Sequence, residues 1–139
     1  MPLTRQQLID IAHRHARVEG EGDIEAVMAT LDPNPTYRFY PIGLGFSGTD
    51  NARRFYEVFM REVKPRLLRY SLDGEWLGDT GVAQEYSITA RGPDNCETTY
   101  QVLGILTFGE NGLSGERLYA SDGFFRLLTG SMWDALQPI

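Results

Sequence analysis

The hydrophobic period of the sequence changes once, at Pro65, and this change limits the folds that the chain can adopt. Before Pro65, apolar residues recur every three to four positions, which is the period of an amphipathic helix. After Pro65 they recur at every second position, which is the period of a β-strand. Helices followed by a run of strands are typical of an α+β domain, with the helices on one face of an antiparallel sheet.

The first half of the chain predicts three helices, over about residues 5–20, 24–31 and 50–63. Thr4 and Gln7 can form a capping box at the start of the first helix, and Asp23 can cap the second. The third helix has the clearest apolar face, which consists of Ala52, Phe55, Tyr56, Phe59, Met60 and Val63. A short strand is predicted over Thr36–Tyr40.

The second half predicts a meander of strands, over about residues 67–76, 82–88, 100–108 and 116–120. Gly78–Gly81 and Gly92–Asn95 supply the first two turns, and Asn111-Gly112 is a strong hairpin signal before the last strand. A short helix is predicted over Phe124–Leu128. With 139 residues, of which 42% are hydrophobic, and no repeat or linker, the chain predicts one domain over residues 1–139.

Charge and composition exclude several classes of partner. The net charge of -6 argues against a nucleic-acid surface, and we interpret the basic cluster Arg61, Lys64, Arg66 and Arg69 as a solvated edge. No apolar run reaches the roughly 20 residues that a membrane helix needs, so no membrane partner is expected. The N-terminus lacks the pattern of a secretory signal, and Cys96 is the single cysteine, so a cytoplasmic protein without an intrachain disulfide is expected.

Two motifs are typical of ligand-binding sites, but the sequence around them does not fit such sites. Gly43–Gly48 matches the dinucleotide pattern G-x-G-x-x-G, but hairpins follow it instead of a second βαβ unit. We therefore interpret it as a flexible loop that borders the pocket. His13 and His15 are two residues apart on a helix and point to different sides, so they cannot chelate one metal ion. We predict neither a cofactor nor a metal site.

The informative residues are polar side chains on faces that are otherwise apolar. His15 shares the stripe of the first helix, and Glu19 lies one turn further along, where it could orient the imidazole and raise its pKa. Glu116 shares a strand face with Leu118 and Ala120, where a carboxylate is costly unless it is paired or used. Structural alternatives remain open: a half-buried pair at the helix end for His15, and a sheet-edge carboxylate for Glu116.

Other residues of these inner faces could line a pocket. The predicted substrate-binding set is Glu19, Phe39, Phe55, Gln84, Tyr86, Tyr100, Val102 and Leu118. Gln84, Tyr86 and Tyr100 lie on inner faces and could present amide or hydroxyl groups, although single tyrosines at such positions are more often packing residues.

The sequence resembles the nuclear transport factor 2-like (NTF2-like) superfamily, in particular its SnoaL-like polyketide cyclase and ketosteroid isomerase branches. The resemblance spans nearly the whole chain and is carried by Gly22–Ala26, Tyr40–Gly43, Phe46–Gly48 with Arg53–Tyr56, and Gly115–Tyr119. It implies a cone-shaped (cystatin-like) fold, in which a curved antiparallel sheet wraps around the three helices. It also implies a ligand cavity at the wide end of the cone and a homodimer through the sheet.

The residues that such enzymes use are only partly present. The catalytic tyrosine of ketosteroid isomerases corresponds to His15, their general-base aspartate to Tyr40, and their protonated aspartate to Gly104. The last-strand aspartate of limonene-epoxide-hydrolase-like members corresponds to Leu118. Steroid isomerisation and that epoxide hydrolysis are therefore not expected, and His15, Tyr40 and Glu116 remain as candidate catalytic residues.

These residues favour an enzyme that uses cofactor-free general acid–base catalysis on a small, apolar, ring-containing carbonyl or hydroxyl compound. A cyclase, dehydratase, isomerase or hydrolase would fit. His15 would carry the proton, Glu116 would be the second acid or base, and Tyr40 would position the substrate or donate to an oxyanion. The alternative is a non-catalytic binding or dimerisation module of the same fold.

A homodimer is also expected from the outer face of the sheet, which mixes polar and apolar groups as a non-obligate interface does. The residues that predict this interface are Arg69, Thr99, Gln101, Leu103, Ile105 and Tyr119.

Overall fold

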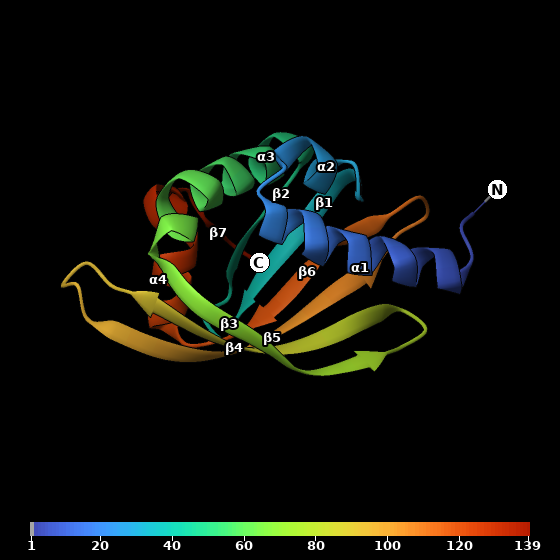
Figure 1. Ribbon diagram of the computed structural model, residues 1–139. Coiled ribbons are helices and arrows are strands. Elements are labelled where there is room, and N and C mark those ends of the chain that lie inside the picture. The colour runs from blue at the N-terminus through green and yellow to red at the C-terminus, as the bar shows by residue number, and fades with distance from the viewer. Residues whose placement is uncertain (1) are drawn as a thin grey trace.

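The computed structural model describes residues 2–139 and has one curved sheet with helices packed on one of its faces (Figure 1). The strands lie in the order β3-β4-β5-β6-β1-β2-β7. Their bounds are β1 Leu31–Tyr40, β2 Leu44–Ser47, β3 Leu67–Leu77, β4 Gly81–Arg91, β5 Glu97–Phe108, β6 Leu113–Tyr119 and β7 Gln137–Pro138. The expected α+β class and the curved sheet are confirmed, with one correction: β1 and β6 pair in parallel, so the sheet is mixed.

The helices cover the inner face of the sheet. They are α1 Arg5–Glu21, α2 Ile24–Met28, α3 Thr49–Val58 and α4 Asp122–Thr129. α3 continues through a π turn, η1 Phe59–Val63, and a 3-10 turn, η2 Lys64–Arg66, while α4 is followed by the 3-10 turn η3 Gly130–Ala135. Helix α1 lies over β4 and β6 and thereby places one of its faces toward the centre of the sheet.

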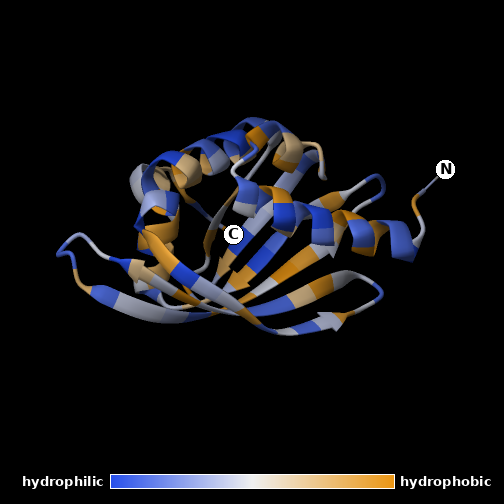
Figure 2. Ribbon diagram, in the orientation of Figure 1, coloured by the Kyte–Doolittle hydropathy of each residue, from blue (hydrophilic) through white to orange (hydrophobic). Residues whose placement is uncertain are grey.

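The first helix forms as its sequence predicts. Thr4 and Gln7 make the reciprocal hydrogen bonds of a capping box, and Gly22 ends the helix in the left-handed conformation, with φ of 79°. Hydrophobic and hydrophilic residues alternate along α1 in Figure 2, as expected for a half-buried helix. Its buried face includes Leu8, Ala12 and His15, which fixes the direction in which the imidazole points.

Two segments differ from the sequence prediction. The second helix ends at Met28, and residues from Leu31 already belong to β1, because Leu31 pairs with Leu113. The glycine-rich segment Gly43–Gly48 is not a flexible loop at the pocket: most of it forms β2, which pairs with β1 and with β7. A Cβ atom at Gly45 would lie 2.0 Å from the Tyr37 carbonyl oxygen, so this glycine allows close approach of two backbones.

An aromatic cluster fills the space between α3, α4 and the strands β1 and β2. Tyr37 stacks on Phe46 with ring centroids 4.7 Å apart, and Phe39 stacks on Phe125 at 4.9 Å. Phe55 contacts both pairs. Burial of these large rings is the main hydrophobic contribution on this side of the sheet. The cavity lies over the inner face of β4 and β5.

The outer face of the sheet carries Leu103 and Tyr119, two of the residues from which a homodimer is expected. Leu103 and Tyr119 are paired across β5 and β6, and they alternate along their strands with the inward Val102 and Leu118. Tyr119 is 40% exposed. The homodimer stays a prediction. In residues 2–139, no helix is both long and apolar enough to cross a membrane.

Gly115 on β6 provides a test of how the site-bearing strand is held against β1. Its φ is 142°, and a Cβ atom there would lie 1.8 Å from the carbonyl oxygen of Thr36. We expect Gly115→Ala to lower the free energy of unfolding by about 3 kcal/mol or more, measured by urea denaturation. Gly43→Ala is the control, because Gly43 also has positive φ but has open space around it. The control should lose about 1 kcal/mol, and equal losses in the two variants would contradict the steric explanation.

Candidate active site

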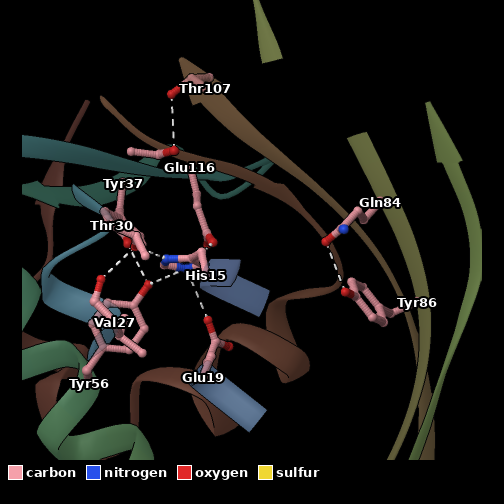
Figure 3. Close-up of polar contacts among 11 residues, drawn as sticks. His15, Glu19, Val27, Thr30, Tyr37, Tyr56, Gln84, Tyr86, Thr107 and Glu116 are labelled. Atoms are coloured by element: carbon pink, nitrogen blue, oxygen red, sulfur yellow. Dashed lines mark hydrogen bonds and ion pairs between the residues drawn. The ribbon is translucent and has the colours of Figure 1, made fainter. Parts of the chain in front are cut away.

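A cavity of about 540 Å³ lies between α1, the α3–η1 helix, α4 and the inner face of β3–β6. This volume is in the range of small-molecule pockets in proteins. Its apolar lining consists mainly of Phe55, Phe59, Val63, Leu67, Ile88, Val102, Leu106, Leu118, Phe124 and Leu128. Polar side chains gather at two places in it: His15, Glu19 and Glu116 on one side, and Gln84 and Tyr86 on the other (Figure 3).

His15 is the centre of the first polar group. The imidazole is 1% exposed, and its Nε2 lies 3.2 Å from Glu19 Oε2 and 3.3 Å from Glu116 Oε1. Glu19 reaches it from one turn further along α1. Glu116 reaches it from β6, where it lies between Tyr37 of β1 and Leu106 of β5 and so shares their buried face.

Thr30 fixes the other nitrogen of the ring. The hydroxyl of Thr30 donates to the Val27 carbonyl oxygen at 2.6 Å, so it can only accept at His15 Nδ1, which lies 2.7 Å away. Nδ1 therefore carries a proton. The proton that can be gained or lost is the one on Nε2, and Nε2 is the atom that faces the two carboxylates.

Two buried tyrosines extend this network away from the cavity. Tyr56 Oη lies 3.1 Å from His15 Nε2, and Tyr37 Oη lies 2.5 Å from Tyr56 Oη. Burial, followed by the negative charge of nearby groups, raises the pKa of both phenols well above the ordinary value of 10.0, so both stay neutral. The two hydroxyl groups share one hydrogen bond, Tyr56 Oη can accept from His15 Nε2, and the Tyr56 ring packs edge-on against the imidazole.

The pKa values of His15 and Glu116 are shifted by burial and by each other. Burial alone would lower the pKa of His15, but the hydrogen bonds and charges of Glu116 and Glu19 outweigh it and raise the pKa from 6.5 to about 9. Burial raises the pKa of Glu116 above its ordinary 4.5, and the hydrogen bond from His15 opposes that rise in part. At neutral pH His15 is therefore an imidazolium, and its Nε2 proton faces Glu116 and Glu19.

A second chain of hydrogen bonds runs along the opposite wall. Tyr86 Oη donates to Gln84 Oε1 at 2.9 Å, and Gln84 Nε2 donates to Glu75 Oε2 at 2.8 Å. Glu75 Oε1 also meets His13 Nε2 at 3.0 Å, outside the cavity at the edge of α1. Although burial raises the pKa of Glu75, the hydrogen bonds from Gln84 and His13 outweigh it, and the net pKa is lowered.

The structure brings together most of the residues that the sequence singled out. His15, Glu19 and Glu116 meet, and Phe55, Gln84, Tyr86, Val102 and Leu118 line the cavity. Three placements are corrected. Tyr40 points to the outer face, where it stacks on Tyr119 at 5.3 Å, because its neighbour Phe39 takes the buried face. Phe39 lies in the aromatic core, and Tyr100 packs against Phe124 instead of lining the cavity.

Thr30, Tyr37 and Tyr56 were not predicted as members of the site. Tyr56 could have been found, because it lies on the apolar stripe of the third predicted helix and a buried phenol needs a hydrogen-bond partner. Tyr37 and Thr30 carry no comparable signal. Their roles depend on tertiary contacts, of Thr30 with His15 on α1 and of Tyr37 with Tyr56 on α3.

One nitrogen of His15 and one oxygen each of Glu19 and Glu116 lie within 4.8 Å of one another, close enough to be considered as metal ligands. A divalent ion would need the lone pair of Nε2. At neutral pH such an ion would have to displace the Nε2 proton, because the pKa of His15 is raised to about 9. The distances also fit charge-assisted hydrogen bonds, in which Nε2 donates its proton toward the two carboxylates and no ion is needed.

Solved structures show the fold of the chain. An NTF2-like protein from Anabaena variabilis has a TM-score of 0.69 with 16% sequence identity, covering 88% of this chain and 95% of that chain. An NTF2-like protein of unknown function from Cytophaga hutchinsonii has a TM-score of 0.68 with 13% identity, covering 82% and 99%. SalBIII, an epoxide hydrolase/cyclase-like enzyme with a role in pyran ring formation in polyether salinomycin, has a TM-score of 0.68 with 16% identity, covering 85% and 93%.

The chain therefore has the NTF2-like fold, which confirms the fold expected from the sequence. The sequence matches no protein-family model and no curated protein. At identities of 13–16%, these likenesses establish the fold and leave the chemistry to be argued from the residues of the site.

The raised pKa of His15 predicts how stability depends on pH. A group that binds its proton more tightly when folded stabilises the protein fully below its unfolded pKa, here 6.5, and loses this contribution as pH rises through about 9. The free energy of unfolding should thus fall between these pH values, by at most about 1.4 kcal/mol per pH unit. The measurement is urea denaturation of the wild-type protein across this range.

The chain offers a matched control, because it contains two histidines. His15→Gln should abolish the fall in stability, whereas His13→Gln should keep it, since His13 is a half-exposed residue of α1. The same pH dependence in all three proteins would show that His15 is not the group responsible.

Proposed function

We propose that the protein is a small-molecule enzyme that uses His15 and Glu116 for cofactor-free general acid–base catalysis on an apolar, ring-containing compound. The observation that carries the proposal is a buried charged pair in the wall of a cavity that is otherwise mostly apolar. Burying an imidazolium and a carboxylate is costly, and such pairs with shifted pKa values gather at active sites. Replacing a buried ion pair by apolar residues of similar volume is often neutral for stability, so packing alone does not explain the pair.

In the proposed reaction, Glu116 removes a proton from the substrate. Its raised pKa makes the buried carboxylate a stronger base than a solvated one. The Nε2 atom of the His15 imidazolium lies 3.3 Å from Glu116 Oε1, the oxygen that takes the proton. Nε2 can then give its own proton to another atom of the substrate. Glu19, whose side chain is 32% exposed, links Nε2 to solvent and allows the protons to be exchanged between turnovers.

This scheme fits a cyclase, dehydratase, isomerase or hydrolase, because each needs one proton removed and one returned. The fold likeness to SalBIII is compatible with cyclase or hydrolase chemistry, but it assigns no residue of this chain. Tyr40 has no part in the scheme, since it faces away from the cavity.

A non-catalytic binding module is the second candidate, and one observation favours it. Within residues 2–139, every fully buried side-chain nitrogen and oxygen already has a hydrogen-bond partner. The network of His15, Thr30, Tyr56 and Tyr37 is thus satisfied without a ligand, as a purely structural network would be. Only a measurement of proton transfer separates the two candidates.

5-Nitrobenzisoxazole is a suitable probe, because this apolar bicyclic compound opens when a base removes one proton from carbon, and the product absorbs visible light. We expect the wild-type protein to open it faster than acetate does at the same concentration. Glu116→Gln should lower the rate constant by about 100-fold or more, the usual contribution of a general base. The rate should be measured spectrophotometrically at neutral pH.

Glu85→Gln is the matched control, since Glu85 is an exposed carboxylate on the outer face of β4 and pairs there with Leu103. This variant should keep the wild-type rate. A rate equal to that of acetate in the wild-type protein, or equal rates in wild-type and Glu116→Gln proteins, would favour the binding module.

A further inference from the structure

Some polar atoms of the cavity interior can still accept a hydrogen bond, because their own hydrogens are already donated within the protein. We infer that the ligand presents a hydroxyl group, as an alcohol does, and not a carbonyl group. This inference names the substrate class of the proposed enzyme and uses the same cavity. It rests on which hydrogens are already committed to partners inside the protein.

The orientation of the Gln84 amide is fixed from outside the cavity. Its Nε2 donates to Glu75 Oε2 at 2.8 Å, and Glu75 is a carboxylate, which can only accept. The amide oxygen must therefore point the other way, toward Tyr86. His13 holds the second oxygen of Glu75 at 3.0 Å and keeps this carboxylate in place.

Gln84 in turn commits the hydroxyl hydrogen of Tyr86. A phenol has a single hydrogen to donate, and that of Tyr86 is used on Gln84 Oε1 at 2.9 Å. Burial, together with the charges of Glu19 and Glu116, raises the pKa of Tyr86 to about 12, so the group stays a phenol. Toward the cavity it has a lone pair left and acts as an acceptor.

The opposite side of the cavity also offers acceptors. His15 donates its Nδ1 hydrogen to Thr30, and its single Nε2 hydrogen faces the two carboxylates and Tyr56 Oη. Glu19 and Glu116 each keep oxygen lone pairs that can accept. In Figure 3 these groups lie across open space from Gln84 and Tyr86.

The remaining polar residues of the lining belong to its more exposed part. Lys64 donates to the Gly20 carbonyl oxygen at 2.9 Å, Arg69 is 66% exposed at its side chain, and Tyr70 is 66% exposed. Apart from the second hydrogen of Gln84 Nε2 and the Nε2 hydrogen of His15, donors lie at the solvent side, whereas Tyr86, Glu19 and Glu116 present acceptors in the interior. A hydroxyl can donate to Tyr86 or to Glu116, but a carbonyl oxygen would face lone pairs and leave these groups without a partner.

A matched pair of probes tests this inference: 1-(2-naphthyl)ethanol and the corresponding ketone, 2-acetylnaphthalene, which share one carbon skeleton. Calorimetric titration of the wild-type protein should give tighter binding of the alcohol, by about fivefold or more, the worth of one hydrogen bond. Equal affinities, tighter binding of the ketone or binding of neither compound would overturn the inference.

Two variants test directly whether the Tyr86 hydroxyl donates its hydrogen to Gln84. Gln84→Leu removes the acceptor of the Tyr86 hydroxyl, which is then free to donate, so the ketone should gain about fivefold in affinity. Adding Tyr86→Phe should remove that gain. Tyr86→Phe alone keeps the ring and serves if Gln84→Leu does not fold; it should weaken the alcohol and leave the ketone unchanged. A ketone affinity unaffected by Gln84→Leu in a folded protein would contradict the assignment.

Gln101→Leu is the matched control, because Gln101 is exposed on β5 and accepts from Ser87 on the outer face. It should leave both affinities as they are. A failure of the inference is distinguishable from a failure of the proposed function. If the alcohol has no advantage while Glu116-dependent opening of 5-nitrobenzisoxazole persists, the substrate class is wrong and the catalytic pair stands.

Discussion

The imidazole of His15 is buried between two carboxylates, and the rest of the site depends on how the cost of that burial is offset. An isolated imidazolium at this depth would lose its proton, because desolvation disfavours the charged form. Glu116 and Glu19 reverse that preference, while Thr30 holds Nδ1 and Tyr56 holds the edge of the ring. The side chain therefore has one orientation, one tautomer and one exchangeable proton, which are the properties that acid–base chemistry requires.

The aromatic core and the candidate active site lie over different strands of the sheet. Large aromatic residues fill the space under α3 and α4 against β1 and β2, and the cavity lies over β4 and β5. Strand β6 joins the two regions: Gly115 allows it to approach β1 closely, and Glu116, the next residue, points into the cavity beside His15. The rigidity of the aromatic region thus supports the position of the carboxylate.

Much of the fold was predictable because its signals are local. The capping box at Thr4, the stripe of the third helix and the turn at Asn111-Gly112 depend on neighbours within a few residues, and the predicted elements agree with the structure there. The parallel pairing of β1 with β6 has no local signal, and neither has the hairpin of β1 with β2, which the glycine pattern at Gly43–Gly48 disguised as a loop.

The candidate site was predictable only in part, because some of its residues have a local signal in the sequence and others do not. A polar residue on an apolar stripe identified His15 and Glu116, whereas the resemblance placed Tyr40 at a catalytic position, although strand alternation turns its ring outward. Thr30 could not be found, because its role depends on a hydrogen bond that exists only after α2 ends and β1 begins.

Nitrogen-15 NMR of the imidazole ring tests the buried charge of His15 most directly. We expect both ring nitrogens of His15 to be protonated at neutral pH, with Nε2 losing its proton only near pH 9, and with a lower pKa in Glu116→Gln. A His15 signal that titrates at or below 6.5, its ordinary value, would contradict the account, because the carboxylates would then not hold the proton.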